Sequence, residues 1–292
     1  MSAALALPAM AAALAALALG LAALAACGAA RWRAATTALV ARLDALAAPS
    51  APAHYAANEL VALPAPVQRY LQRVLPEGAP IVRSARLRHA GEFNLAADGE
   101  RWKAFVSTQE VRCARPGFVW HARVRAVPGV TVQVHDAYVG GEGLLHAALL
   151  GLLPLARQQG TGAFARDELM RWLAEAAWYP TALLPSQGVR WEPIDAHRAR
   201  ATLRDGDVEA TLEFEFGADD LIAAVRAPAR GRLVGGRSVD TPWEGRWSRY
   251  AQRGGMWIPT AGEVAWLPPE GRRPYWRGTL TAVAYDGAPS AR

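Results

Sequence analysis

The first thirty residues constrain this chain most, because the 28 positions from Ala3 to Ala30 contain no charged side chain. Sixteen of these positions are alanine and seven are leucine. As a helix the run is about 40 Å long, more than the roughly 30 Å hydrocarbon core of a bilayer. A soluble alanine-rich helix needs a polar face, which this run lacks. We therefore expect an N-terminal hydrophobic helix, a membrane anchor or signal, that makes the membrane a partner of this protein.

Two signals disagree about the side of the membrane on which the rest of the chain lies. The run Leu24–Cys27 matches the lipobox of bacterial lipoproteins, in which a diacylglycerol is attached to the cysteine, and this favours a domain outside the cytoplasm. The first arginines, Arg31 and Arg33, follow the apolar run, and the positive-inside rule then favours a cytoplasmic domain. We predict a cell-membrane location with a single N-terminal anchor, leave the side open, and regard Cys27 as a candidate lipidation site.

The basic residues argue against nucleic acid as a partner. The chain has 32 basic and 26 acidic residues, a net charge of +6, but Lys103 is its only lysine. A lysine-rich tail and a Walker-type phosphate loop are therefore excluded. A cluster of arginines either contacts phosphates or forms a solvated loop, and we favour the loop for Arg226, Arg230, Arg232 and Arg237. With two cysteines and no metal-ligand spacing, we expect no metal and no cofactor.

The chain divides into three parts by composition. Residues 1–30 form the hydrophobic anchor or signal, residues 31–76 a helical stalk with an Ala- and Pro-rich linker, and residues 77–288 a β-rich domain. In the stalk, apolar residues recur at helical spacing at Leu39, Val40 and Leu43. A second helix begins near Pro66 and ends before Pro76.

Beyond residue 77 the hydrophobic period changes to that of strands. Two-residue turns predict hairpins at Asp98-Gly99, Asp205-Gly206 and Gly254-Gly255. In the three hairpins, the predicted cross-strand partners are Phe93 with Ala104, Leu203 with Val208, and Ala251 with Ile258. A hairpin around Pro128-Gly129 needs a bulge to keep its apolar residues on one face. We expect a β-rich α+β fold in which about eleven strands form a curved antiparallel sheet, a half-barrel.

One interruption of the strands predicts a helical cap. Residues 144–155 are almost wholly apolar and lie between glycines, and residues 166–178 have an amphipathic helical pattern. We expect helices over 144–178 that cap the concave face of the sheet, either as a lid or as a core-filling pair.

Several short runs resemble known families. The runs Phe105–Gln109, Pro116–Ala122 and Asp136–Gly143 resemble LolA- and LolB-like lipoprotein carriers, whose half-barrels hold acyl chains in an apolar cavity. This resemblance implies an extracytoplasmic lipid-binding domain. Together with Glu168–Pro180, Pro242–Gly245 and Trp276–Gly278, these runs also resemble an uncharacterised bacterial family, a domain of unknown function, over most of residues 64–286.

Catalytic chemistry has one weak candidate. His121 and His135 fall on adjacent predicted strands, with Asp136 and Tyr138 nearby, and these four residues are the candidates for an acid–base site. Histidines on the polar face of a sheet are the more ordinary interpretation. Asp136 alternates onto the apolar face, and we interpret it as a buried carboxylate paired with an arginine. No catalytic motif supports an enzyme, so we predict no catalytic residue and lean toward a protein that is not an enzyme.

The excess of aromatic residues gives the leading hypothesis. Eleven tryptophans are more than ordinary usage, and many alternate in predicted strands. Large aromatic side chains fill a core or line a cavity for an apolar ligand. We predict that the ligand contacts Phe118, Trp120, Tyr138, Phe214, Phe216, Trp257, Trp266 and Trp276.

Three hypotheses for the function follow. The first is membrane-tethered, non-catalytic binding of a lipid or another apolar small molecule in this aromatic cavity. The second is an enzyme with the acid–base site described above. The third is a structural module that docks on a membrane-protein partner, which predicts a large exposed apolar patch and no enclosed cavity. The ligand and the oligomeric state stay open.

Overall fold

The computed structural model describes residues 3–46, 52–96 and 99–286. Its helices are α1 (Ala3–Asp44), α2 (Ala65–Val74) and α3 (Ala163–Glu175), with 3-10 helices η1 (Ala57–Leu60), η2 (Ala176–Trp178), η3 (Pro180–Leu183) and η4 (Pro185–Gln187). The strands of the first half are β1 (Ser84–Asn94), β2 (Trp102–Arg112), β3 (Gly117–Val127), β4 (Val130–Val139), β5 (Glu142–Leu149) and β6 (Leu153–Gly160). Those of the second half are β7 (Arg190–Pro193), β8 (Arg198–Asp205), β9 (Val208–Phe216), β10 (Ile222–Val234), β11 (Arg237–Arg253), β12 (Met256–Trp266) and β13 (Arg273–Tyr285).

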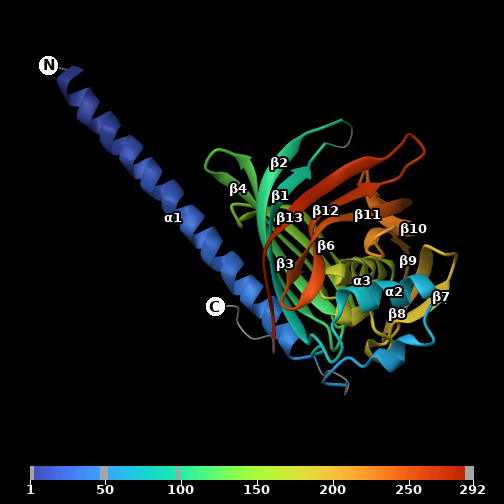
Figure 1. Ribbon diagram of the computed structural model, residues 1–292. Coiled ribbons are helices and arrows are strands. Elements are labelled where there is room, and N and C mark those ends of the chain that lie inside the picture. Colours follow the sequence, from blue (N-terminus) through green and yellow to red (C-terminus); the bar gives the residue numbers. More distant parts are fainter. Residues whose placement is uncertain (1–2, 47–51, 97–98, 287–292) are drawn as a thin grey trace.

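All thirteen strands form one curved, unclosed antiparallel sheet in the order β6-β5-β4-β3-β2-β1-β13-β12-β11-β10-β9-β8-β7 (Figure 1). Each half is a meander of neighbouring hairpins, and the pairing of β1 with β13 joins the first half to the second. The β-rich fold class expected from the sequence is confirmed, with thirteen strands in place of about eleven.

The two additional strands, β5 and β6, lie where the sequence predicted part of a helical cap, so that prediction is wrong for these residues. Residues 144–155 form most of β5 and the start of β6, and only α3 with η2 is helical in the predicted 144–178 region. Strand β5 has α1 on one side and α3 on the other, since Leu144 packs with the α1 cluster and Gly143 lies against Phe164 of α3. A strand covered on both faces has no alternation of polar and apolar residues, which is why it resembled a helix.

Helix α3 lies inside the curve of the sheet (Figure 1) and contacts both halves, with β5 on one side and β9 on the other. Its residues Leu169, Trp172 and Leu173 are buried in the main core. Away from α3, the two halves also meet at Asp205, which accepts hydrogen bonds from the Tyr138 hydroxyl (2.9 Å) and from Arg115 (3.0 Å).

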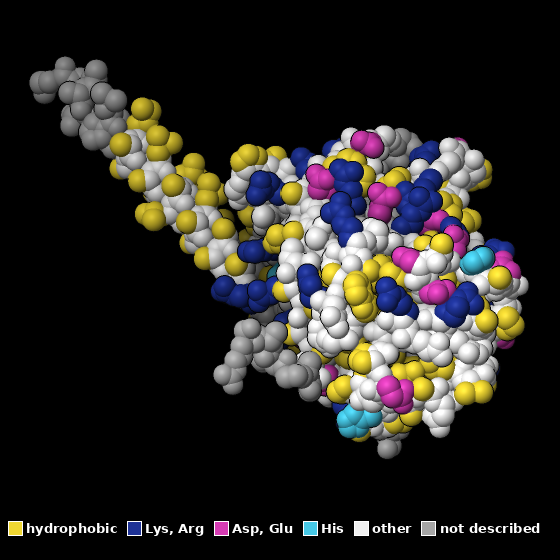
Figure 2. All heavy atoms as spheres, in the orientation of Figure 1, with side chains coloured by type: hydrophobic (Ala, Val, Ile, Leu, Met, Phe, Trp, Pro, Cys, Tyr) yellow, Lys and Arg dark blue, Asp and Glu magenta, His cyan; other side chains and the backbone are white. Residues whose placement is uncertain are grey.

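The C-terminal part of α1 packs on the outer face of the sheet, and its N-terminal part projects away from the domain (Figures 1 and 2). Leu43, which is 1% exposed, packs against Val119 and Val139, so the predicted stalk helix is continuous with the anchor helix and lies on the sheet. The leucines between Leu14 and Leu24 in the projecting part are exposed, for example Leu19 at 72%. Met10–Asp44 is the one helix in the described chain that is long and apolar enough to cross a membrane.

The predicted hairpins form, with two corrections of register. The third turn is confirmed, because Ala251 pairs with Ile258. In the second hairpin Leu203 pairs with Ala210, two residues from the expected partner, because Gly206 adopts a φ of +60° and forms the first position of a Gly206-Asp207 turn.

The first hairpin departs from its predicted register, whereas the fourth forms with its predicted bulge. Phe93 pairs with Lys103, one residue away from the expected Ala104, so the register predicted for the first hairpin is wrong; Asp98 of its predicted turn lies outside the described residues. In the hairpin around Pro128-Gly129 the predicted bulge is present between Arg125 and Val127.

The close approach of α1 to the β5–β6 turn depends on a glycine. A Cβ atom at Gly28 would collide with the backbone carbonyl oxygen of Leu150, whereas a Cβ at Gly20 would have no neighbour within 4 Å. We predict that Gly28→Val displaces this part of α1 and increases amide hydrogen exchange of residues 29–44 roughly tenfold, an overpacking cost of about 1.4 kcal/mol. Hydrogen exchange of the full chain in detergent measures this effect. Gly20→Val in the same helix is the control, and equal exchange in both variants would contradict the packing described here.

Candidate functional site

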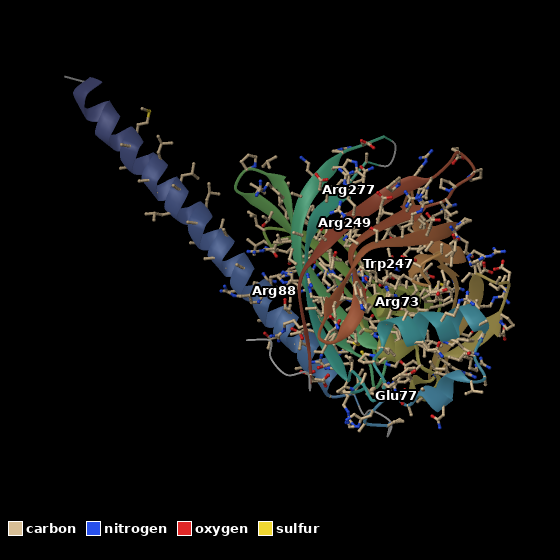
Figure 3. The ribbon with its side chains drawn as sticks, in the orientation of Figure 1. Arg73, Glu77, Arg88, Trp247, Arg249 and Arg277 are labelled. Carbon is tan, nitrogen blue, oxygen red and sulfur yellow. The ribbon has the colours of Figure 1, made fainter. Side chains whose placement is uncertain are left out.

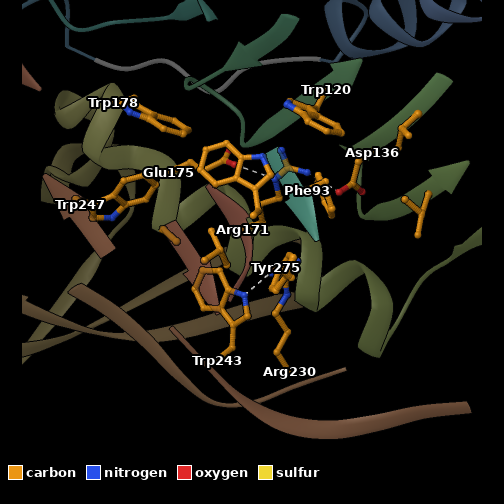
Figure 4. Close-up of a pocket in the computed structure, with 15 residues that line it drawn as sticks. Phe93, Trp120, Asp136, Arg171, Glu175, Trp178, Arg230, Trp243, Trp247 and Tyr275 are labelled. Atoms are coloured by element: carbon orange, nitrogen blue, oxygen red, sulfur yellow. Dashed lines mark hydrogen bonds and ion pairs between the residues drawn. The ribbon is translucent and has the colours of Figure 1, made fainter. Parts of the chain in front are cut away.

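A cavity of about 110 Å³ lies between α3 and the inner face of the sheet (Figure 4). Its wall contains seven aromatic side chains from both halves of the sheet and from η2: Phe93, Trp120, Trp178, Trp243, Trp247, Tyr275 and Trp276. Charged groups from α3, β4 and β10 also line it, namely Arg171, Glu175, Asp136 and Arg230, and aliphatic side chains such as Val264 of β12 form the rest of the wall. The site is therefore a small aromatic chamber with ionic groups on one side.

Glycines on the inner face make room for two of these indole rings. Gly91, Gly278 and Gly262 are neighbours across β1, β13 and β12. A Cβ at Gly262 would lie 2.5 Å from the ring of Trp247, and one at Gly278 would lie 2.7 Å from that of Trp276. The absence of side chains at these positions lets both rings lie inside the curve of the sheet, where Trp247 is found (Figure 3).

Arg171 of α3 is the centre of the charged side of the cavity. Its guanidinium forms ion pairs with Asp136 of β4 and, at 2.8 Å, with Glu175 one turn along the helix. It also lies over the rings of Phe118 and Trp120, 4.8 and 5.1 Å from their centroids. The predicted pairing of Asp136 with an arginine is confirmed, and the partner is Arg171.

A second arginine and a second acid extend the charged cluster. Arg230 of β10 lies 5.1 Å from the centroid of the Trp243 ring and 3.6 Å from Glu168 of α3. Burial, with the neighbouring Asp136 carboxylate as the next cause, raises the pKa of Glu168 well above its usual range. Although burial opposes the charge of Arg171, the carboxylates of Glu175, Asp136 and Glu168 raise its pKa. The acids around Arg171 thus favour its cationic form inside the domain.

One polar atom in the cavity wall has no hydrogen-bond partner among the described residues, the Nε1 donor of Trp247. The carboxyl group of Asp136 shares a hydrogen bond with Glu168, which contributes to the raised pKa of Glu168. Buried polar atoms are normally satisfied by protein, water or a ligand. The chamber therefore offers one free donor to a molecule that enters it.

The structure brings only part of the predicted ligand set to this cavity. Trp120 and Trp276 line it, whereas the other predicted residues lie elsewhere in the core or at its edge. Phe214 and Phe216 pack with Trp191 in the β7–β9 region, and Tyr138 is bound to Asp205. The remaining three have other neighbours: Phe118 lies beneath Arg171, Trp257 beside Arg73, and Trp266 is stacked on Tyr275.

Sequence reasoning missed Phe93, Trp178, Trp243, Trp247 and Tyr275 as cavity residues. Trp243 and Trp247 are separated by four positions on β11 and hence face the same side. Gly245 lies between them, and Gly262 pairs with Trp247. This pattern of glycines beside tryptophans was the signal in the sequence that could have identified them as cavity residues.

The arginines of residues 226–237 do not form a solvated loop. They lie in β10 and at the start of β11, around a short turn at Gly235 and Gly236. Arg226 pairs with Glu215 and with Glu244, and Arg230 is buried. The sequence predicted a loop here because the arginines interrupt the alternation of polar and apolar residues that is typical of a strand.

The histidines and the acid of the predicted acid–base site lie on different faces of the sheet. His121 pairs with His135 across β3 and β4, with ring centroids 5.5 Å apart, and both face α1. Trp32 of α1 stacks on His135 at 4.1 Å. Asp136 and Tyr138 face the opposite side, so the four groups do not converge. No group of three or more His, Cys, Asp or Glu side chains suited to a metal ion is present in the part of the chain that the structure describes.

Comparisons with known proteins identify the family. Residues 61–285 match the family of unknown function DUF6920, and the chain belongs to this family. The expected membership of an uncharacterised family is thus confirmed. Among curated proteins, none matches the chain.

Three solved structures have a limited backbone similarity to this chain. A LolA superfamily protein, NE2245 from Nitrosomonas europaea, has 12% identity and a TM-score of 0.40, with 77% of this chain and 93% of that chain covered. A DUF1329 family protein from Desulfovibrio piger has 14% identity and a TM-score of 0.36, with 72% and 88% covered. A beta-barrel-like DUF1849 protein from Brucella abortus has 11% identity and a TM-score of 0.24, with 70% and 99% covered.

The ion pairs of Arg171 make a stability prediction. Arg171→Met leaves Asp136 and Glu175 buried without their cation, so we expect the free energy of unfolding to fall by about 3–5 kcal/mol. Arg42→Met, which removes an exposed pair with Glu142, is the control and should cost less than about 1 kcal/mol. Urea unfolding of the full chain in detergent compares the two. Equal losses would mean that the buried pairs contribute no more than the exposed one.

His89, next to Trp178 with ring centroids 4.5 Å apart, makes a pH prediction. Burial, and to a lesser degree Arg171, lowers the pKa of His89 to about 3, and neither ring nitrogen has a partner among the described residues. Below about pH 6.5 the imidazole is protonated in the unfolded chain but stays neutral in the folded chain. The free energy of unfolding therefore decreases as the pH falls from 6.5 toward 3. At pH 5 the loss is about 2 kcal/mol.

We predict that His89→Phe reduces the loss of stability between pH 7 and pH 5 by this amount. Urea unfolding at both pH values measures the difference. The exposed His197→Phe serves as the control and should keep the pH dependence of the wild type. An unchanged pH dependence in His89→Phe would show that this imidazole is not held neutral.

Proposed function

We propose that this protein is a membrane-tethered binding protein that holds a lipid or another apolar small molecule in the aromatic cavity beneath α3. The observation that carries the proposal is the cavity itself, an open space surrounded by seven aromatic side chains. Apolar pockets with a few placed polar groups are the ordinary form of a small-molecule site. The third hypothesis, a docking module, predicted no enclosed cavity, and the cavity therefore favours ligand binding over it.

The dimensions and polarity of the cavity narrow the ligand class. Its volume of about 110 Å³ is smaller than the roughly 150 Å³ of a cavity that binds benzene. As it stands, the space takes a short chain segment, and a ring or a complete acyl chain requires aromatic side chains to move apart. The free donor on Trp247 suits a ligand with a hydroxyl or carbonyl oxygen beside its apolar part.

The tether in this proposal is the projecting part of α1. An apolar N-terminal helix is consistent with an anchor or with a signal sequence. Cys27 is exposed and stands one residue before Gly28, where α1 reaches the domain. A lipid on Cys27 and a membrane-spanning α1 would therefore hold the domain at the same distance from the bilayer.

Filling the cavity tests the proposal. Val264 of β12 lines the chamber, and Val264→Phe occupies the space that the ligand would use. We expect native mass spectrometry of the detergent-purified full chain to find copurified apolar ligand on the wild type and at least about fivefold less on the variant. Val239→Phe, at an exposed position outside the cavity, is the control and should retain the ligand. A wild type without ligand, or equal occupancy in both variants, would contradict the proposal.

A further inference from the structure

A second hollow, of about 590 Å³, lies on the outer face of the sheet between α1 and strands β1 to β4. Its side chains include Arg33 of α1, Arg88 of β1 and Arg123 of β3, which together we call the arginine groove. Figure 3 shows Arg88 beside α1, and Figure 2 shows basic side chains gathered where α1 meets the domain. None of the described residues that line the groove is acidic, so its charge is positive.

The three arginines differ from their neighbours in having no carboxylate partner. On the same outer face, Arg86 pairs with Glu110 at 2.5 Å and Arg112 pairs with Asp44. Arg33, Arg88 and Arg123 have no ion pair among the described residues. Three guanidinium groups around one hollow, without a counter-charge, form a site for an anion. Arginine suits phosphate best, because its planar fork matches two phosphate oxygens at once.

The groove lies at the end of the apolar part of α1. Ala29, Trp32 and Arg33 belong to its wall, and the uncharged run ends at Ala30. At 1.5 Å per residue, Arg33 lies about 4.5 Å beyond that end along the helix. If α1 is embedded as proposed above, this is the level of the lipid headgroups.

Exposed apolar side chains lie close to the same level. The β5–β6 turn contacts Gly28, and the amide of Leu150 in that turn donates to Thr131 of β4, which brings the β3–β4 turn alongside. Val127 in the β3–β4 hairpin and Leu153 after the β5–β6 turn are 54% and 59% exposed. Apolar side chains beside a basic groove are the combination that binds the surface of an anionic membrane.

We infer that the arginine groove binds the phosphate of an anionic phospholipid headgroup and thereby holds the domain in one orientation on the membrane. The inference rests on the membrane attachment in the proposed function, but it concerns the face of the sheet opposite to the aromatic cavity. A ligand in the cavity and a headgroup in the groove are bound by different side chains, so either can fail without the other.

The test compares two triple variants of the full chain in a nonionic detergent. R33Q/R88Q/R123Q removes the groove arginines, and R101Q/R204Q/R253Q removes three exposed arginines elsewhere, with the same change in net charge. Native mass spectrometry measures the retention of phosphatidylglycerol and of phosphatidylcholine with the same acyl chains. We expect wild type and the second variant to prefer phosphatidylglycerol roughly tenfold, and the groove variant to lose this preference. Thermal unfolding confirms that all three proteins are folded.

A second arm adds inorganic phosphate at millimolar concentration. We expect the retention of phosphatidylglycerol to be unchanged, because the acyl chains and the apolar turns hold the lipid in addition to the arginines. Displacement by inorganic phosphate would identify free phosphate as the occupant and overturn the assignment to a lipid. Equal preference in the two triple variants, or no preference in the wild type, would also overturn it. The Val264→Phe variant should keep the preference, which separates this site from the cavity.

Discussion

The packing of α3 inside the curved sheet is the interaction on which the rest of the structure depends. The sheet is open, with β6 at one edge and β7 at the other, and α3 is the segment that connects these halves in sequence and contacts both in space. Because α3 carries Arg171 and Glu175, the interior contains charges that must be paired, and Asp136 of β4 supplies one partner. Burying such a cluster costs several kcal/mol per ion without pairing, so the charges fix how the helix sits against the sheet. The space left beside them is the aromatic cavity.

The sheet has a different role on each of its faces. Strand β4 illustrates this directly, because His135 faces α1 and the next residue, Asp136, faces α3. On the inside, alternate residues build a cavity; on the outside, they hold α1 against the domain. The position at which α1 leaves the sheet, near Gly28, then determines which hairpin turns and which arginines lie next to the end of the apolar part of α1. A single antiparallel sheet thus carries two separate surfaces, a cavity on its inner face and a groove on its outer face beside α1.

Much of the fold could be predicted from local patterns, and the failures have physical causes. Two-residue alternation identified eleven strands, and the glycine pair at 254–255 gave the correct register. The register of the 205–206 hairpin was wrong by two residues, a shift that leaves every side chain on the same face and so leaves the pattern intact. Strands β5 and β6 were missed because β5 is covered by α1 and by α3 and has no polar face. In the candidate site Trp120 and Trp276 were predicted, whereas Trp178 and Arg171 reach the cavity from the helical segment.

The sequence by itself determined the uncharged N-terminal helix, the β-rich class and the inward position of Asp136, because charge, turn residues and alternation are properties of short segments. The tertiary structure alone decided which aromatic residues share the cavity, since strands from opposite halves meet there only through the curvature of the sheet and the insertion of α3. It also decided that residues 31–44 lie on the sheet, and that Arg33, Arg88 and Arg123 surround one groove. These positions are far apart in the chain, and long-range packing brings them together.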